Sequence, residues 1–488
     1  MEKFFKPKTK HYLYLAFIGA LVLRLFNLNY EGLWNDELFT ADTANPANSI
    51  SHIIFLLKLD IHPPLHNILS YFWSHIFSYS DTSLRVFNVV IGLGGLLSLY
   101  HLGKLLFNKK VALYAVLLAT VNFFLIRYSQ EVRAYGLLFL LSNYSFYFFV
   151  KLLRGEMNTK NSIAYVLITT ALLYTHYFGM FVMASQFAAS FVIINWTIVK
   201  RQFWKYLITF VGPILLFSFW FPILKVHLER ETKSWRDAPS LEMVYTYTQE
   251  FFNDYALAFI ASSLVLLTGV FLMLRRFRKV KFVEKLIKNK VKVLAMLVIW
   301  TAVYFMIPYF KSSWSTSMMV TRYFIVMLAP ILLILAFYLS KIKGRSLRNG
   351  ILATVLGYSL LLLFLKENPY YAQTTSYREI AAETKLMNND PPIFYLANTT
   401  NERYFRYYLT QYKFSKGRVN FDALTQLVGR ESSNEYFVFL DLRPVPEKYK
   451  KAIPMVEGYY KSDSTTFANK YNIQTVRRIR YKKRKDSL

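Results

Sequence analysis

Asp36 and Glu37 place two carboxylates side by side in the stretch GLWNDELFT, directly after the apolar run from His11 to Tyr30. A carboxylate can remove the proton of a hydroxyl group that lies within hydrogen-bond reach. The pair therefore permits general-base chemistry at the point where the chain leaves an apolar segment. A solvated loop is the alternative interpretation, and the other polar residues decide between the two.

Several more polar residues stand at the ends of apolar runs. Ionisable groups at membrane depth are costly and are functional by default, whereas those at loop ends cost less. The candidates are Asp42, Asp60 and His62 in residues 30–82, Gln130, Glu131, Arg133 and Tyr135 in RYSQEVRAY, His176 in THYFG, the stretch HLERETKSWRD, and Arg322 and Tyr323 in TRY.

One carboxylate together with two or more arginines suits one reaction in particular. If a sugar is carried on a lipid phosphate, the leaving group is already an anion, so it needs cations rather than an acid. The acceptor hydroxyl still needs a base. A hydrolase of sugar chains would instead need two carboxylates with divergent pKa values.

The elements that must position these residues are predicted to be transmembrane helices. The chain has 488 residues, of which 54% are hydrophobic and 18% aromatic. A bilayer needs about 20 apolar residues for each helical span. We predict eleven spans, at residues 11–29, 83–106, 111–127, 134–153, 161–175, 177–198, 205–223, 254–274, 293–310, 321–340 and 350–365.

The formal charge of +30 is distributed as in a membrane protein rather than a nucleic-acid-binding protein. The N-terminal segment and every second connection after it together hold 26 of the 59 Lys and Arg residues; they are residues 1–10, 103–110, 151–160, 199–205, 275–292 and 341–349. The connection 30–82, on the opposite side, holds only Lys58. Positive residues collect on the cytoplasmic side. We therefore predict a multi-pass protein of the cell (inner or plasma) membrane, with a cytoplasmic N-terminus, an extracytoplasmic C-terminal domain, membrane lipids as partners and no nucleic acid.

Two absences narrow the chemistry further. No small-residue cleavage site follows the first apolar run, so this run is expected to be a retained anchor. The chain has no cysteine, which excludes a thiol nucleophile, an iron–sulfur cluster and disulfide bonds.

The first outer loop, residues 30–82, contains two short amphipathic stretches, PANSISHIIFLLKLD and PPLHNILSYFWSHIF. Each is too short to span a bilayer, and helices of this kind lie in the membrane interface. Pro63 and Pro64 suit the first turn of the second helix, where a missing amide hydrogen has no cost. Chance periodicity in an ordinary loop is the alternative.

Residues 366–488 differ in composition from residues 1–365. PPIFYLAN and EYFVFLDL predict buried strands, and SYREIAAETKLM and NFDALTQLVG predict helices. We therefore expect a small extracytoplasmic α/β domain of about 120 residues after a transmembrane module at 1–365. The basic stretch RRIRYKKRK is interpreted as a tail that is either solvated or bound to anionic headgroups.

The ordered motifs G-x-W-N-D-E, D-x-H-P-P-L, L-R-V-F, Y-S-Q-E-x-R-A-Y and R-Y, spread over about residues 11–335, resemble one family. They are similar to those of the polyprenyl-phosphate-dependent glycosyltransferases with the GT-C fold, in the protein mannosyltransferase and aminoarabinose transferase group (family 39). The resemblance implies an inverting membrane glycosyltransferase that moves a sugar from a polyprenyl-phosphate donor to an extracytoplasmic acceptor. Lipopolysaccharide, another glycolipid or cell-envelope glycan, and protein all fit as acceptors.

The resemblance also implies roles for individual residues. Asp36 matches the catalytic base and Glu37 a neighbour that orients the reactants. The residues expected to bind substrate are Asp60, His62, Gln130, Glu131, Arg133, Tyr135, His176, Arg322 and Tyr323.

Simpler roles stand beside these. Glu37 could be merely structural, and His176 could be a plain interface residue. Asp60 could cap the surface helix, Arg133 could pair only with Glu131, and Arg24 could snorkel or pair with a loop acid. His62 and His66 have the spacing of a metal pair, but a third ligand is missing nearby, so no metal site and no required cofactor are expected.

A transporter or flippase of lipid-linked sugars is the alternative function. Such a protein would show broken spans at matching positions in two halves, with charges near the midplane. Here the acids gather in one outer loop, which favours the transferase. The sequence leaves open the sugar, the acceptor, the dependence on a divalent metal, the oligomeric state and the role of the C-terminal domain.

Overall fold

The structure is a computed structural model that describes residues 9–365 except 194–195, 231–238, 241 and 278–289. Beyond residue 365 it describes Arg378, residues 406–408 and 410–411, and five strands. The chain forms two compact units. The first contains Met1–Phe26, Ala47–Phe72 and Arg85–Tyr370, and the second contains Asn27–Pro46, Trp73–Leu84 and Tyr371–Leu488.

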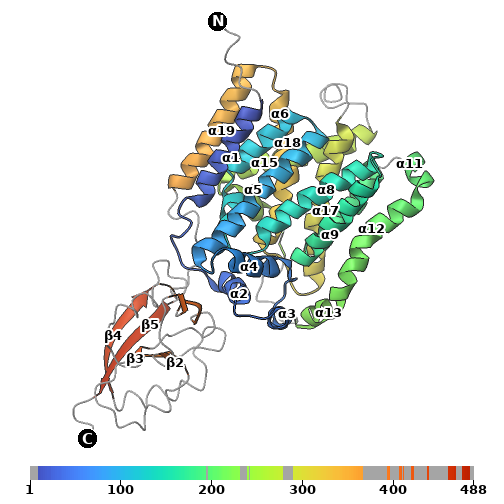
Figure 1. The fold of residues 1–488 in the computed structure, drawn as a ribbon. Helices are drawn as coiled ribbons and strands as arrows, with labels where there is room; N and C mark the ends of the chain where they lie inside the picture. Colours follow the sequence, from blue (N-terminus) through green and yellow to red (C-terminus); the bar gives the residue numbers. More distant parts are fainter. Residues whose placement is uncertain are drawn as a thin grey trace. The chain divides into compact units, whose positions relative to one another are not determined.

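Long apolar helices lie side by side in the first unit (Figure 1). Their core includes the fully buried Trp300, which stacks on Phe146 with ring centroids 3.6 Å apart. The helices are α1 (Thr9–Leu25), α5 (Asp81–Leu106, from residue 85 on), α6 (Lys109–Thr120), α7 (Phe123–Gln130), α8 (Tyr135–Leu153), α9 (Thr159–Thr175), α10 (Gly179–Ile193), α11 (Trp196–Arg201), α12 (Phe203–Phe217), η1 (Ser218–Trp220), α13 (Phe221–Arg230), α14 (Glu242–Phe252), α15 (Tyr255–Phe277), α17 (Val291–Trp314), η2 (Thr321–Met327), α18 (Leu328–Lys341) and α19 (Arg345–Leu365).

Every predicted span falls on one or more of these helices, and the chain is a multi-pass membrane protein. Within the described residues, seven helices are long and apolar enough to cross a bilayer, and the bent pair of α6 and α7 would add an eighth. The remaining three predicted spans correspond to α1, α9 and α10, which have 17, 17 and 15 residues. These three are shorter than the roughly 20 residues of an untilted span.

The break between α6 and α7 bends the chain by 66°. The guanidinium of Arg24, on α1, donates to the carbonyl oxygens of Ala119 and Thr120 at 3.4 and 3.3 Å and to Ser129 Oγ at 3.1 Å. These carbonyls end α6 and would otherwise lack partners. Arg24 is fully buried, so it does not snorkel to the water; it stabilises the bend.

Three short helices precede α5. The two predicted amphipathic helices are confirmed as α3 (Ile50–Leu59) and α4 (Leu65–Ile76). The third, α2 (Asn35–Thr43), was not predicted, and it carries Asp36 and Glu37 in its first turn. The Glu37 carboxylate accepts a hydrogen bond from the backbone N–H of Trp34 at 3.2 Å, which closes the start of α2.

The second unit contains two small sheets. β1 (Ile393–Tyr395) pairs in parallel with β2 (Val419–Phe421), and β5 (Thr475–Lys483) lies between β3 (Phe437–Val438) and β4 (Tyr460–Ala468) in antiparallel pairing. β1 and β3 fall within the two predicted strands. The predicted helices at 376–387 and 420–429 lie almost wholly outside the described residues, so the α/β class of this part stays a prediction.

The interpretation of the basic stretch as a tail is wrong. Arg477 to Lys483 form most of β5, which pairs with β4 from Tyr460 opposite Lys483 to Ala468 opposite Thr475. Thr475, Val476, Ile479 and Tyr481 are residue types that favour extended backbone. The basic residues between them had masked this preference.

Candidate active site

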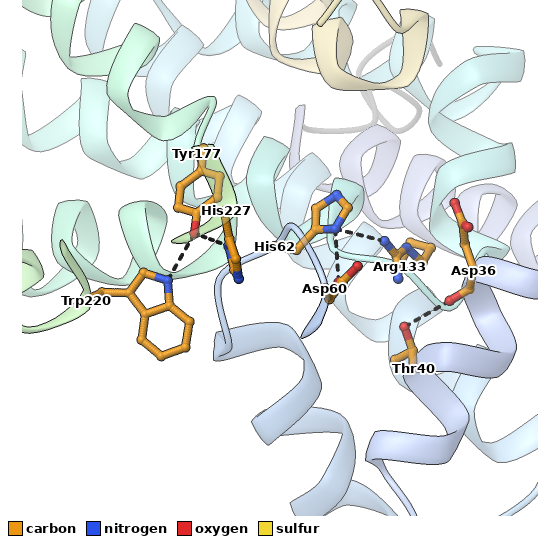
Figure 2. Close-up of polar contacts among 8 residues, drawn as sticks. All are labelled: Asp36, Thr40, Asp60, His62, Arg133, Tyr177, Trp220 and His227. Atoms are coloured by element: carbon orange, nitrogen blue, oxygen red, sulfur yellow. Dashed lines mark hydrogen bonds and ion pairs between the residues drawn. The ribbon is translucent and has the colours of Figure 1, made fainter. Parts of the chain in front are cut away.

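Three polar side chains of the first unit meet although they are distant in sequence (Figure 2). Asp60 and His62 lie between α3 and α4, and Arg133 lies between α7 and α8. His62 Nδ1 is 3.1 Å from Asp60 Oδ2 and 3.3 Å from Arg133 Nη2. An arginine can only donate. His62 Nδ1 therefore either accepts from Arg133 or, when it carries the proton, donates to Asp60.

Asp60 is held in its charged form by this cluster. Burial alone would raise the pKa of its carboxyl, but His62 and Arg133 outweigh burial and lower the pKa to about 2. Asp60 also ends α3. Because the Asp60 carboxylate contacts His62, Asp60 does more than cap α3. Arg133 also contacts His62, so Arg133 does not pair with Glu131 alone.

The lowered pKa predicts how Asp60 contributes to stability in acid. The pKa falls from 3.8 to about 2, so ionised Asp60 stabilises the fold above about pH 4, and this contribution disappears as the pH falls through 2. We expect Asp60→Asn to lower the free energy of unfolding by about 2 kcal/mol near neutrality. Thermal unfolding of both proteins in detergent should show this difference shrinking between pH 4 and pH 2. A difference that stays constant over this range would contradict the assignment.

A group of rings adjoins His62. His176, which follows α9, lies 5.3 Å from His62 and 4.7 Å from Tyr323 between ring centroids. Tyr135, which begins α8, lies 6.2 Å from His176. The Arg322 guanidinium carbon lies 5.8 Å from the Tyr135 ring centroid and 5.9 Å from the Tyr323 ring centroid. Arg133 and Arg322 thus lie on the same aromatic cluster.

His176 presents a hydrogen-bond donor. Its Nδ1 accepts from the backbone N–H of Phe178 at 3.2 Å, so in the neutral ring the proton is on Nε2. Burial lowers the pKa of His176 well below its ordinary value, and His62, Arg133 and Arg322 lower it further, so the ring is neutral. The turn that sets this geometry depends on Gly179, since a Cβ there would lie 3.0 Å from the Leu172 carbonyl oxygen.

Two buried polar atoms of this cluster, His176 Nε2 and the Tyr135 hydroxyl, have no hydrogen-bond partner within the described residues. The side chains are 3% and 1% exposed. Buried polar groups that stay unsatisfied cost free energy. Both can donate, and two guanidinium groups lie nearby, so the cluster can bind an anion such as a phosphate.

Other predicted residues have more local roles. The Gln130 amide nitrogen donates to the carbonyls of Arg24 and Phe26 at 2.9 and 2.8 Å, which ties the end of α7 to the end of α1. Glu131 ends α7, and its carbonyl accepts from the Arg133 N–H at 2.7 Å.

In the second unit, Thr40 Oγ1 donates to the carbonyl of Asp36 at 3.4 Å, as Figure 2 shows. The Asp36 side chain is half-buried and Glu37 is buried. The roles of both residues stay predictions.

The structure also adds residues that the motifs did not single out. The Tyr177 hydroxyl oxygen lies 2.7 Å from His227 Nδ1 and accepts a hydrogen bond from Trp220 Nε1 at 3.1 Å (Figure 2). Tyr177 stands in THYFG and His227 begins HLERETKSWRD, so the sequence held a signal for the stretches but not for the pairing.

The two histidines with metal-like spacing have different partners. His66 Nε2 lies 2.9 Å from Asn88 Oδ1, whereas His62 contacts Asp60 and Arg133. Burial lowers the pKa of His66 to about 4. Among the residues that the structure describes, no three His, Asp or Glu side chains are grouped so that they could hold a metal ion.

Comparison with known proteins identifies the fold and a family resemblance of one part of the chain. Residues 61–221, which carry His62, Arg133 and His176, match the family model described as dolichyl-phosphate-mannose-protein mannosyltransferase. No curated protein matches the chain.

Solved structures agree over nearly the whole length. ArnT from Cupriavidus metallidurans in the apo state aligns with a TM-score of 0.60 and 14% identity over 97% of this chain and 98% of that chain. ArnT bound to undecaprenyl phosphate aligns with a TM-score of 0.58 and 13% identity over 98% and 99%. An apo oligosaccharyltransferase from Archaeoglobus fulgidus aligns with a TM-score of 0.52 and 12% identity over 100% and 76%. The chain therefore has the fold of these solved structures, and residues 61–221 are similar to the mannosyltransferase family.

Proposed function

We propose that the protein transfers a sugar from a polyprenyl-phosphate donor to an extracytoplasmic acceptor by a single inverting displacement. The observation that carries this proposal is the cluster of Arg133, Arg322, His176 and Tyr135. Its two guanidinium groups and two buried, unsatisfied donors suit the phosphate of a lipid-linked donor. The solved ArnT complex with undecaprenyl phosphate supports this class of donor.

The chemistry needs only a base and cations. The acceptor oxygen attacks the anomeric carbon of the sugar, and the bond from this carbon to the phosphate oxygen breaks. The electron pair stays on the polyprenyl phosphate, where Arg133, Arg322 and the donors of His176 and Tyr135 stabilise the charge. The acceptor proton passes to a base, which we assign to Asp36 on the sequence motif. Glu37 orients the start of α2.

Asp60 and His62 have a supporting role in this scheme. Together they hold Arg133 in place, since His62 Nδ1 lies between the carboxylate and the guanidinium. The Tyr323 ring lies 4.7 Å from the His176 ring between centroids, and we assign it to substrate binding on the sequence motif. Neither a metal ion nor another cofactor is required by this mechanism. Lipopolysaccharide, another envelope glycan and protein all stay open as acceptors.

A transporter made of two related halves would show broken spans in matching positions. In the described part of the chain, α6 and α7 form the one bent pair. The transferase is therefore the better proposal.

The proposal requires the second unit to be extracytoplasmic. The distribution of Lys and Arg predicts this orientation, with the N-terminus in the cytoplasm of a cell whose inner or plasma membrane holds the protein. We expect a reporter fused after Leu488 to give an extracytoplasmic signal, and a fusion in residues 341–349 to give a cytoplasmic one. A cytoplasmic signal at Leu488 would place the α2 segment on the wrong side and contradict the scheme.

The experiment that tests the function joins two measurements. Glycolipids, envelope glycans and glycoproteins of a deletion strain are compared with those of the wild type, and the missing sugar identifies the product. Purified protein in lipid nanodiscs is then titrated with undecaprenyl phosphate. We expect one missing modification and saturable binding. An unchanged glycan profile together with no binding would overturn the proposal.

A further inference from the structure

Two tyrosines of the second unit hold one buried carboxylate, Asp81. The hydroxyl of Tyr407 donates to Asp81 Oδ1 at 2.6 Å, and the hydroxyl of Tyr408 donates to Oδ2 at 3.0 Å. All three residues are buried. A carboxyl group that is buried away from water needs hydrogen-bond partners within the protein, and these two hydroxyl groups supply them. Residues 406–408 are therefore fastened firmly to Asp81.

Tyr408 makes a second contact that Tyr407 does not share. Its hydroxyl oxygen accepts from the backbone N–H of Leu33 at 2.5 Å. Leu33 is fully buried and directly precedes Trp34, the residue before the first turn of α2. One hydroxyl group thus joins the chain entering α2 to Asp81.

The backbone before α2 approaches the C-terminal segment so closely that a side chain at Gly32 would have to displace it. A Cβ there would lie 2.9 Å from Arg378 Cβ and 3.0 Å from the Tyr408 hydroxyl. Arg378 donates to the carbonyls of Asn29 and Tyr30 at 3.1 and 2.9 Å. The stretch from Asn29 to Leu33 is therefore held at several points along its length.

The far end of α2 is held in the same way. The hydroxyl of Tyr79 donates to the Ala41 carbonyl at 3.0 Å, and the Tyr79 ring packs edge-on against Tyr407 with centroids 5.2 Å apart. Gln411 donates to the Tyr79 carbonyl at 2.7 Å. Residues from the C-terminal part of the chain thus contact both the entry to α2 and the residue that holds its end.

We propose that Tyr408 is a positioning residue for the transfer reaction, because its hydroxyl fixes the start of the helix that carries Asp36. This inference rests on the proposed function, in which Asp36 is the base. A base must lie within about 2.6–3.2 Å of the proton that it removes. A displacement of about 1 Å can lower a rate by about 100-fold. Leu33 is three residues from Asp36, so a change at Leu33 is transmitted directly to the first turn.

The test is Tyr408→Phe in the full-length protein. This change keeps the ring, removes the acceptor of the Leu33 N–H and leaves Asp81 with Tyr407. We expect amide hydrogen exchange in a peptide covering residues 33–38 to become about 10-fold faster, because one buried hydrogen bond is lost. In the deletion strain, the amount of restored sugar should fall by about 10-fold or more. Binding of undecaprenyl phosphate should not change.

Tyr407→Phe is the matched control. It removes one hydrogen bond to Asp81 but none to Leu33, so exchange at 33–38 and sugar transfer should both stay near wild type. Gly32→Ala is a second route to the same effect, because the added methyl group must push Arg378 or Tyr408 away. Gly32→Ala should make amide hydrogen exchange at residues 33–38 faster and reduce sugar transfer, as Tyr408→Phe does. Thermal unfolding of each purified variant checks that it is folded.

The outcomes separate this inference from the proposed function. Wild-type exchange at 33–38 in Tyr408→Phe would overturn the inference, and so would faster exchange with full sugar transfer. Loss of transfer in Tyr407→Phe to the same extent would also overturn it, because the effect would then not pass through Leu33. Full sugar transfer by Asp36→Asn would instead show that Asp36 is not the base, which contradicts the proposed function. The exchange results would still test the hydrogen bond between Tyr408 and Leu33.

Discussion

Asp36→Asn is expected to lower the rate of sugar transfer by about 10²–10⁴, the range that general-base catalysis supplies. The change keeps the size of the side chain and its ability to form hydrogen bonds but removes the basic oxygen. In the proposed reaction the polyprenyl phosphate leaves as an anion without an acid, so the base assigned to Asp36 is the main group that moves a proton. Protein level and binding of undecaprenyl phosphate should stay nearly unchanged, since Asp36 is not assigned to the phosphate.

Glu37→Gln is the matched comparison at the neighbouring position. The Glu37 carboxylate accepts from the Trp34 N–H, and the amide oxygen of glutamine can accept the same hydrogen bond. The loss of rate should therefore be much smaller than for Asp36→Asn. Initial rates measured with membranes from the complemented deletion strain decide between them. If Glu37→Gln is the more damaging change, the two roles are exchanged; if Asp36→Asn keeps near-normal rates, Asp60 is the next candidate for the base.

The transmembrane part of the fold was predictable because its signal is local. Each apolar run is read from consecutive residues, and every predicted span falls on helix in the structure. The bend between α6 and α7 was not predictable in the same way. It depends on Arg24 of α1, which donates to the carbonyls of Ala119 and Thr120 almost 100 residues later. No pattern within residues 109–130 contains that information.

In the candidate site, too, the residues were predictable from local motifs but their contacts were not. The motifs identified Asp60, His62 and Arg133 as functional candidates. They did not predict that Nδ1 of His62 lies next to both the Asp60 carboxylate and the Arg133 guanidinium. The donor of His176 depends on the Phe178 N–H that reaches Nδ1 in the turn before α10. The contact of Tyr177 with His227 joins residues 50 positions apart. Such pairings arise from packing, so a single sequence gives the residue types but not their partners.

The second unit was the least predictable. α2 is nine residues long, and most of its side chains are buried, so it lacks the alternation of polar and apolar faces that marked α3 and α4. The buried contacts of Asp81 with Tyr407 and Tyr408 join positions 326 and 327 residues apart. The basic residues of β5 suggested a solvated tail, although its β-branched and aromatic residues favour a strand.

The second large effect is expected for the phosphate contacts. Arg133→Ala should weaken the binding of undecaprenyl phosphate by about 10- to 100-fold, because a charge-assisted hydrogen bond in a poorly hydrated site contributes about 1.5–3 kcal/mol. Arg322→Ala should have an effect of the same size. Arg154→Ala is the matched control, since Arg154 donates to the Leu105 carbonyl at 2.8 Å and is not assigned to the site. Unchanged binding in both Arg133→Ala and Arg322→Ala would contradict the assignment.

A double variant separates direct contact from an indirect effect. Arg133 also helps to keep Asp60 charged, so its loss could weaken binding by leaving the Asp60 carboxylate poorly balanced beside the phosphate. In Asp60→Asn/Arg133→Ala this carboxylate is gone. If Arg133 acts only by balancing Asp60, the double variant should recover the binding that Arg133→Ala loses. If Arg133 contacts the phosphate, as we expect, the double variant should bind as weakly as Arg133→Ala, because the missing donor cannot be replaced by an amide on a different segment.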